Sequence, residues 1–176
     1  MAIRNVIIVA AVAGTAAIIA MQARAGGDKV SFPVLFPEGV LYTTVDRADN
    51  KQYREIYVSA AALQAAKKGE ALPSGTVITL IQYAAKLGAD GNPEKDANGR
   101  FIKGNRLAYT VMEKRAGWGA EYPPEIRNGE WEYQAFNGEK KVNDKANLTA
   151  CFQCHKPLPG GQDFVFTYDK MKSAAK

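Results

Sequence analysis

Hydrophobic and polar residues alternate with a period of two along much of the chain beyond residue 40, and this pattern predicts β-strands. The alternating runs are rich in β-branched and aromatic residues and are separated by turn residues. We expect strands at residues 41–45, 54–58, 76–87, 107–114, 131–136 and 163–168. The polar stretch 88–106 should let strand 107–114 return antiparallel to strand 76–87.

Three segments differ in how much of their surface should be buried. Both faces of strand 76–87 are largely apolar, which favours a central position in the sheet. Strand 131–136 alternates large and polar residues, as a strand buried on one face does. The charged run 113–115 is expected to meet solvent at a strand end, and Trp118 and Trp131 are expected to pack in the core.

Helical patterns are few and short. Residues 59–68 form the clearest one, with Ser59 as the N-cap, alanines in the interior and Gly69 as the stop. Residues 123–128 are expected to make one helical turn, and residues 147–155 a second short helix. The expected fold is therefore α+β, mainly an antiparallel β-sheet with a few short helices. A helix bundle is excluded because the sequence does not contain four long amphipathic helical segments.

The N-terminus has the three parts of a secretory signal peptide. Arg4 gives a positive start, residues 6–20 are apolar, and Ala23, Arg24 and Ala25 form an A-x-A cleavage site. We expect residues 1–25 to be removed and residues 26–176 to form a single domain exported to an oxidising compartment, most simply a bacterial periplasm. The alternative is an uncleaved anchor, but the apolar run is shorter than the roughly 20 residues that span a bilayer. No membrane contact is expected after cleavage.

Composition agrees with one compact domain, since 47% of the 176 residues are hydrophobic and 23% are charged. The formal net charge of +5 falls to +3 once Arg4 and Arg24 are removed with the signal peptide. The basic residues are scattered and form no basic run or helical basic face. Nucleic-acid binding is therefore not expected.

The candidate chemistry is concentrated in five positions. The chain has two cysteines and one histidine, and Cys151, Cys154 and His155 form the C-x-x-C-H signature of c-type haem attachment. Each thiol would add to one haem vinyl group, and His155 would then ligate the iron. A disulfide or thioredoxin-like redox pair between the cysteines is an alternative. A zinc site is another, but it lacks a fourth Cys or His ligand.

The sixth ligand of the iron is not evident in the sequence. A second histidine does not exist, and the mature chain contains only Met112 and Met171 as methionines. We favour packing roles for both methionines and an open iron position, which would bind small molecules. A simple electron-transfer cytochrome with Met171 as axial ligand is the third option.

Seven segments together are similar to those of a known family. They are REIYV at 54–58, ALPSGTV at 71–77, YAAKL at 83–87, VMEKRAGWG at 111–119, RNGEWE at 127–132, CFQCH at 151–155 and DFVFT at 163–167. The chain resembles the cytochrome P-460 family over nearly its whole mature length. The resemblance implies a homodimeric, mainly β periplasmic protein with one covalently bound, five-coordinate haem c that oxidises hydroxylamine. Cytochrome c′-beta, a relative on the same fold, binds nitric oxide without catalysis and provides the alternative function.

The resemblance also implies a lysine cross-link to a meso carbon of the porphyrin, which we assign to Lys86. By strand alternation, Lys86 lies on the same face as Ile78 and Leu80, an apolar face that could hold a macrocycle. The alternatives are that Lys86 only reaches solvent at a strand end, or that Lys103 is the linked residue.

The implied reaction begins with hydroxylamine bound to iron through nitrogen. It is oxidised through an iron nitrosyl to nitrous oxide or nitrite, and the electrons pass to a periplasmic acceptor such as a cytochrome c. Competent family members place a glutamate a few residues before the haem motif, where this chain has Ala146. Asp144 is a possible substitute or a helix-capping carboxylate. The sequence therefore predicts impaired turnover of hydroxylamine.

Overall fold

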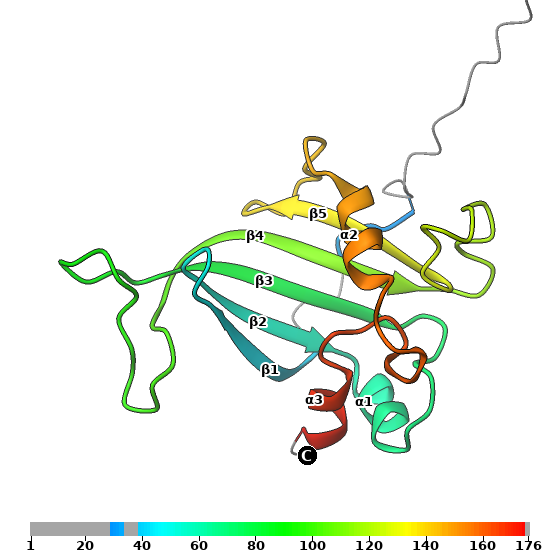
Figure 1. The fold of residues 1–176 in the computed structure, drawn as a ribbon, viewed down its shortest axis with the longest axis horizontal. Coiled ribbons are helices and arrows are strands. Elements are labelled where there is room, and N and C mark those ends of the chain that lie inside the picture. The colour runs from blue at the N-terminus through cyan, green and yellow to red at the C-terminus, as the bar shows by residue number, and fades with distance from the viewer. Residues whose placement is uncertain (1–28, 34–38, 175–176) are drawn as a thin grey trace, which may run out of the picture.

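The computed structural model describes residues 29–33 and 39–174 (Figure 1). The expected signal peptide, residues 1–25, lies outside the described residues. No helix within the described residues is long and apolar enough to cross a membrane.

One antiparallel sheet of five strands forms the centre of the fold. The strands are β1 (Val40–Arg47), β2 (Gln52–Val58), β3 (Val77–Ala85), β4 (Lys103–Lys114) and β5 (Trp131–Asn137). Their order in the sheet is their order in the sequence, so each strand pairs with its neighbours along the chain. The apolar strand β3 is the central one, as its two apolar faces predict.

Three short helices accompany the sheet, so the predicted α+β fold is confirmed. They are α1 (Ala60–Lys67), α2 (Leu148–His155) and α3 (Tyr168–Ser173). A 3-10 turn, η1, spans Gly160–Gln162. Ser59 caps α1 by accepting a hydrogen bond from the backbone N–H of Ala62, and Gly69 ends this segment with a φ of 75°. Helices α1 and α3 pack against each other at one end of the sheet (Figure 1).

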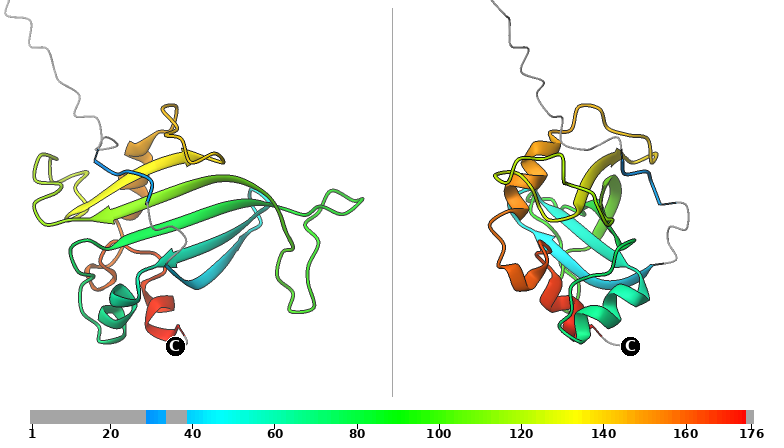
Figure 2. Two further views of the ribbon diagram at one scale, coloured as in Figure 1. Left: turned by 180° about the vertical axis from the view of Figure 1, so that it is seen from behind. Right: turned by 90° about the vertical axis from the view of Figure 1, so that its right-hand side faces the viewer.

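Different parts of the chain cover the two faces of the sheet. One face, called the cavity face below, packs Ile56, Ile78 and Met112 into a core with residues of all three helices. The opposite face packs Ile81, Tyr109 and other residues against Val30, Phe32 and Trp118. Figure 2 shows α2 and the segment 29–33 on opposite sides of the sheet. The motif-bearing helix therefore lies on the cavity face alone.

The predicted last strand, residues 163–168, is wrong. Asp163 and Phe164 have positive φ values of 46° and 59°, and Tyr168 already begins α3. The chain turns here because the Asp163 carboxylate is bound by groups from distant segments. The helical turn expected at 123–128 is a hydrogen-bonded turn closed on the carbonyl of Pro123, and no helix is formed there.

One prediction of solvent exposure is wrong, and a second holds only in part. Strand β5 is buried on both faces, because the segment 29–32 and the loop before β5 cover the side that carries Glu132 and Gln134. In the run 113–115, Arg115 is exposed as expected, but Glu113 is buried and the Lys114 side chain is only 11% exposed. The Lys114 ammonium lies inside because it pairs with Asp163.

An arm, residues 86–102, joins β3 to β4 and projects from the end of the sheet away from the helices (Figure 1). Asp46 at the end of β1 ties the arm to the sheet. Its carboxylate accepts hydrogen bonds from the Arg100 guanidinium (2.8 and 3.1 Å) and from the backbone N–H of Phe101 (3.1 Å).

Candidate functional site: an apolar cavity beneath the C-x-x-C-H helix

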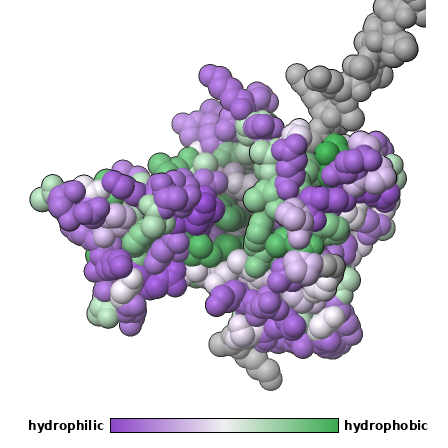
Figure 3. Space-filling view, in the orientation of Figure 1, coloured by the Kyte–Doolittle hydropathy of each residue, from purple (hydrophilic) through white to green (hydrophobic). Residues whose placement is uncertain are grey.

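A cavity of about 530 Å³ lies between the cavity face of the sheet and the segments that carry the motif. Its volume falls in the range of small-molecule and cofactor sites, about 300–1,000 Å³. Helix α2 and residues 165–167 form one wall, and strands β1 to β5 form the other. Figure 3 shows this side of the molecule hollowed, with hydrophobic residues in the hollow.

The sheet wall becomes more polar along the strands. Strand register aligns Ile78, Met112 and Tyr133 in one row, Ile56, Leu80 and Thr110 in the next, and Val45, Arg54 and Gln82 in the third. Arg47 adds a second guanidinium beside the third row, and this one is paired with the carboxylate of Asp49. The cavity is thus apolar at one end and cationic at the other, which suits a flat apolar group that carries anionic substituents.

All three residues of the predicted motif line this cavity. Cys151 is partly buried, Cys154 is exposed, and both are free thiols. Burial and the neighbouring Cys154 raise the pKa of the Cys151 thiol. Among the described residues, no group of three or more His, Cys, Asp and Glu side chains is placed to hold a metal ion. The zinc alternative therefore gains no support from the fold.

His155 is oriented by a backbone carbonyl. Its Nδ1 lies 2.7 Å from the carbonyl oxygen of Phe164, and because a carbonyl only accepts, Nδ1 carries the proton. The lone pair is then on Nε2, the atom available to a metal. Burial lowers the pKa of His155, which favours this neutral form. The rings of Tyr133 and Phe166 pack at 5.1 and 4.9 Å from the imidazole.

The two candidate cross-linking lysines lie in different places. Lys86 follows β3, its side chain is 60% exposed, and its ammonium pairs with Glu94 of the arm at 2.6 Å, so it does not line the cavity. Lys103 bonds Glu55 at 2.7 Å on the opposite face, where the hydroxyls of Tyr57 and Tyr83 also donate to Glu55. Neither lysine therefore lines the cavity among the described residues.

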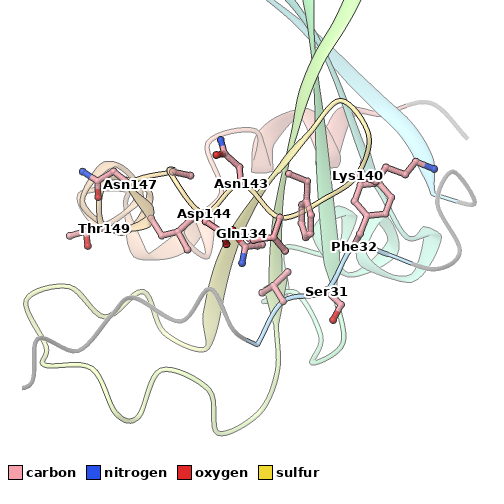
Figure 4. A pocket seen from close by; sticks show the side chains of 13 residues that line it. Ser31, Phe32, Gln134, Lys140, Asn143, Asp144, Asn147 and Thr149 are labelled. Carbon is pink, nitrogen blue, oxygen red and sulfur yellow. The ribbon is translucent and has the colours of Figure 1, made fainter.

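No carboxylate lines the cavity within the described part of the chain. Asp144 and Ala146 line a separate, open cleft beside β5, together with Gln134 and Asn147 (Figure 4). The segment that was expected to supply a distal base therefore lines a different cleft from the motif residues. The polar side chains that do reach the cavity are Arg54, Gln82 and Thr110, in addition to the motif residues and Tyr133.

The two methionines Met112 and Met171 lie in different environments. Met112 lines the cavity from β4, whereas Met171 is fully buried in α3 within the core and does not line the cavity. The position of Met171 favours the packing role over axial ligation.

The donor set fits a haem. Two thiols and an imidazole with a free Nε2 face one cavity, whose floor is apolar and whose far end holds two guanidiniums. A sheet of this kind with the motif on one covering helix defines a class of cytochrome that is not a helix bundle. Residues 38–167 match the cytochrome P-460 family, and the chain belongs to this family. A search of curated proteins finds no match.

The sequence located the motif but not its surroundings. The polar wall residues Arg54 and Gln82 were not singled out, because nothing local marks them as cavity residues. Only their register on β2 and β3 brings them opposite each other. Asp163 and Lys114, which hold the turn beside His155, were also missed.

Proposed function

We propose that the protein is exported, loses residues 1–25, and carries one haem c joined through Cys151 and Cys154, with His155 as the iron ligand. We propose further that it binds hydroxylamine and oxidises it with impaired turnover. The observation that carries the proposal is the single cavity that collects all three motif residues. Membership of the cytochrome P-460 family supports it.

The residues of the cavity would divide the work. When bound, the haem supplies the iron that takes the ligand and the electrons. His155 offers Nε2 because Phe164 holds the proton on Nδ1. Arg54, Gln82 and Thr110 present hydrogen-bond donors that can orient a small ligand with nitrogen and oxygen atoms, and Gln82 already donates to Thr110 at 2.9 Å. Most of the remaining side chains of the sheet wall are apolar and would pack against the flat group.

A second candidate function is non-catalytic binding of nitric oxide. It is favoured by the same wall, because no carboxylate among the described lining residues can take a proton from bound hydroxylamine. Nitric oxide binding requires no proton acceptor. The two functions share the haem and differ in turnover.

The Lys86 cross-link belongs to the proposal as well. Its support is the resemblance to the family together with the exposure of the Lys86 side chain, which pairs with Glu94 at the surface. A lysine in such a pair can change rotamer at little cost. We propose that it turns toward the porphyrin when haem is bound.

The first test is a peptide mass map and an optical spectrum of the protein produced in a periplasm with c-haem maturation. The expected product begins at Gly26 and carries haem on the peptide containing Cys151 and Cys154, joined to the peptide of Lys86 and with a red-shifted Soret band. Haem on the two thioethers alone, with an ordinary Soret band, would contradict the cross-link. A product without haem would contradict the proposed function as a whole.

Two further parts concern partners. We propose a homodimer and a periplasmic cytochrome c as electron acceptor. Sedimentation equilibrium of the mature protein should give twice the chain mass, and hydroxylamine-dependent reduction of a small cytochrome c should require the haem. A monomer would contradict the first part, and failure of every cytochrome c tested to accept electrons would contradict the second.

A further inference from the structure

The turn beside His155 has an unfavourable backbone. Asp163 and Phe164 are consecutive non-glycine residues with φ values of 46° and 59°. Side chains disfavour this left-handed region, although Asp and Asn tolerate it better than most residues. Such a conformation persists only where the surroundings hold it. Phe164 is also the residue whose carbonyl binds His155 Nδ1.

The carboxylate of Asp163 holds the first half of the turn. It accepts hydrogen bonds from the backbone N–H of Leu72 at 2.9 Å, from the Lys114 ammonium at 2.9 and 3.2 Å, and from the Trp131 indole N–H at 3.4 Å. The side chains of Asp163 and Lys114 are 14% and 11% exposed, so water screens this pair little. The donors come from the loop after α1, from the end of β4 and from the start of β5.

Gly129 holds the second half. A Cβ placed on Gly129 would lie 3.1 Å from Cε2 of Phe164, so the Phe164 ring is packed directly on this glycine. The ring and the carboxylate therefore fix the two consecutive residues from different sides. The Phe164 carbonyl is left pointing at the imidazole.

We propose that Asp163 is a positioning residue which, through Lys114, holds the Phe164 carbonyl against His155 Nδ1 and so sets the electron-donating strength of His155 Nε2 toward the haem iron. This inference rests on the proposed function only in one respect: it takes the haem iron to be the metal that His155 Nε2 binds. A strong acceptor at Nδ1–H raises the basicity of Nε2. A more basic ligand stabilises the ferric state and lowers the reduction potential.

The first variant is Asp163→Asn. Asparagine tolerates the positive φ and keeps the shape of the side chain, but it removes the charge that binds Lys114. The expected results in the haem protein are a reduction potential shifted to more positive values and an iron–histidine stretching frequency shifted down in the ferrous form. Lys114→Gln removes the charge from the other side of the pair and should shift both quantities in the same directions.

The matched control is Asp46→Asn. Asp46 binds a guanidinium and a backbone N–H much as Asp163 binds an ammonium and a backbone N–H, but it anchors the arm and does not touch His155. It should lower stability and leave the potential unchanged. If Asp163→Asn and Lys114→Gln also lower stability without moving the potential or the stretching frequency, the pair is only structural and the proposal is wrong.

A measurement without haem separates this inference from the proposed function. His155 is the only histidine of the chain, so a ¹⁵N-labelled apo protein gives a single imidazole spin system. The wild type should show a protonated Nδ1 whose proton exchanges slowly with water. Asp163→Asn should raise that exchange rate about tenfold, in line with the loss of one hydrogen bond. Equal exchange rates in the two proteins would overturn the proposal, whether or not the haem assignment stands.

Discussion

At the scale of single residues, the chemistry depends on which side chains reach the cavity. Arg54 and Gln82 are register partners on β2 and β3, and both line it. Burial and the nearby Arg47 lower the pKa of Arg54, yet a guanidinium remains charged at any ordinary pH. The wall therefore supplies hydrogen-bond donors and positive charge, whereas proton abstraction from hydroxylamine calls for an acceptor.

Gln82→Glu adds that acceptor with almost no change in shape. We expect the rate of hydroxylamine oxidation to rise by about tenfold or more, since general bases contribute about 10²–10⁴-fold when well placed. The variant is compared with the wild-type protein, which has glutamine at this position. The measurement is steady-state turnover of hydroxylamine with a cytochrome c as electron acceptor. The added activity should be lost as pH falls through the pKa of the new carboxyl. Equal turnover in both proteins would show that a missing base is not what limits the reaction.

At the scale of elements, the sheet fixes the cavity wall while the segments around it are held by a few polar contacts. The arm between β3 and β4 is one such segment, and its anchor is Asp46. Hydrogen bonds from Arg100 and from the Phe101 backbone lower the pKa of the Asp46 carboxyl below its ordinary value. The folded state therefore binds a proton at Asp46 less readily than the unfolded state does.

The sign of the pH effect follows from this lowered pKa. The stability that Asp46 contributes is present above the unfolded-state pKa, near 4, and is lost as pH falls through the folded-state value. Asp46→Asn should thus be less stable than the wild type at pH 7, by about 1 kcal/mol, and the two proteins should converge as pH falls below the folded-state pKa. Urea unfolding at a series of pH values measures this. A difference that is constant down to pH 2 would contradict the assignment.

Helix α3 allows a test of the methionine question. Met171 is fully buried among residues of the core, so Met171→Ala should cost about 3 kcal/mol in the free energy of unfolding. The visible spectrum of the haem protein should not change, because Met171 does not line the cavity. Met112→Leu, a volume-conserving change within the cavity, is the comparison variant. A spectrum that becomes five-coordinate only in Met171→Ala would restore the axial-ligand option.

At the scale of the whole molecule, the cavity couples haem to stability. An apolar cavity lies between the sheet and α2, and a group that binds there only in the folded protein stabilises it. The double variant Cys151→Ser, Cys154→Ser should therefore unfold at lower urea concentration than the haem-loaded wild type and should bind more of a hydrophobic dye. Wild type made without haem maturation is the control and should match the double variant. A double variant as stable as the loaded protein would show that haem contributes nothing to the fold.

The sequence by itself determined the features that depend on neighbouring residues. Period-two alternation located all five strands of the sheet within a few residues, and the apolar faces of 76–87 predicted the central position of β3. Ser59 marked the start of α1 as its N-cap, and the helix expected at residues 147–155 is α2. The spacing of Cys151, Cys154 and His155 marked the site, because c-type haem attachment requires the two cysteines and the histidine within five consecutive residues.

Only the tertiary structure decided what lies around that site. The residues 163–168 have the alternation of a strand, yet the donors that bind Asp163 come from 91, 49 and 32 residues away, and these long-range bonds turn the chain instead. Lys103 lies on the opposite face of the sheet, and Asp144 lies in a separate cleft. Strand register sets the first position and the path of the loop after β5 sets the second. Local patterns record propensity and periodicity, whereas buried polar groups select partners by distance in space, which a single sequence does not display.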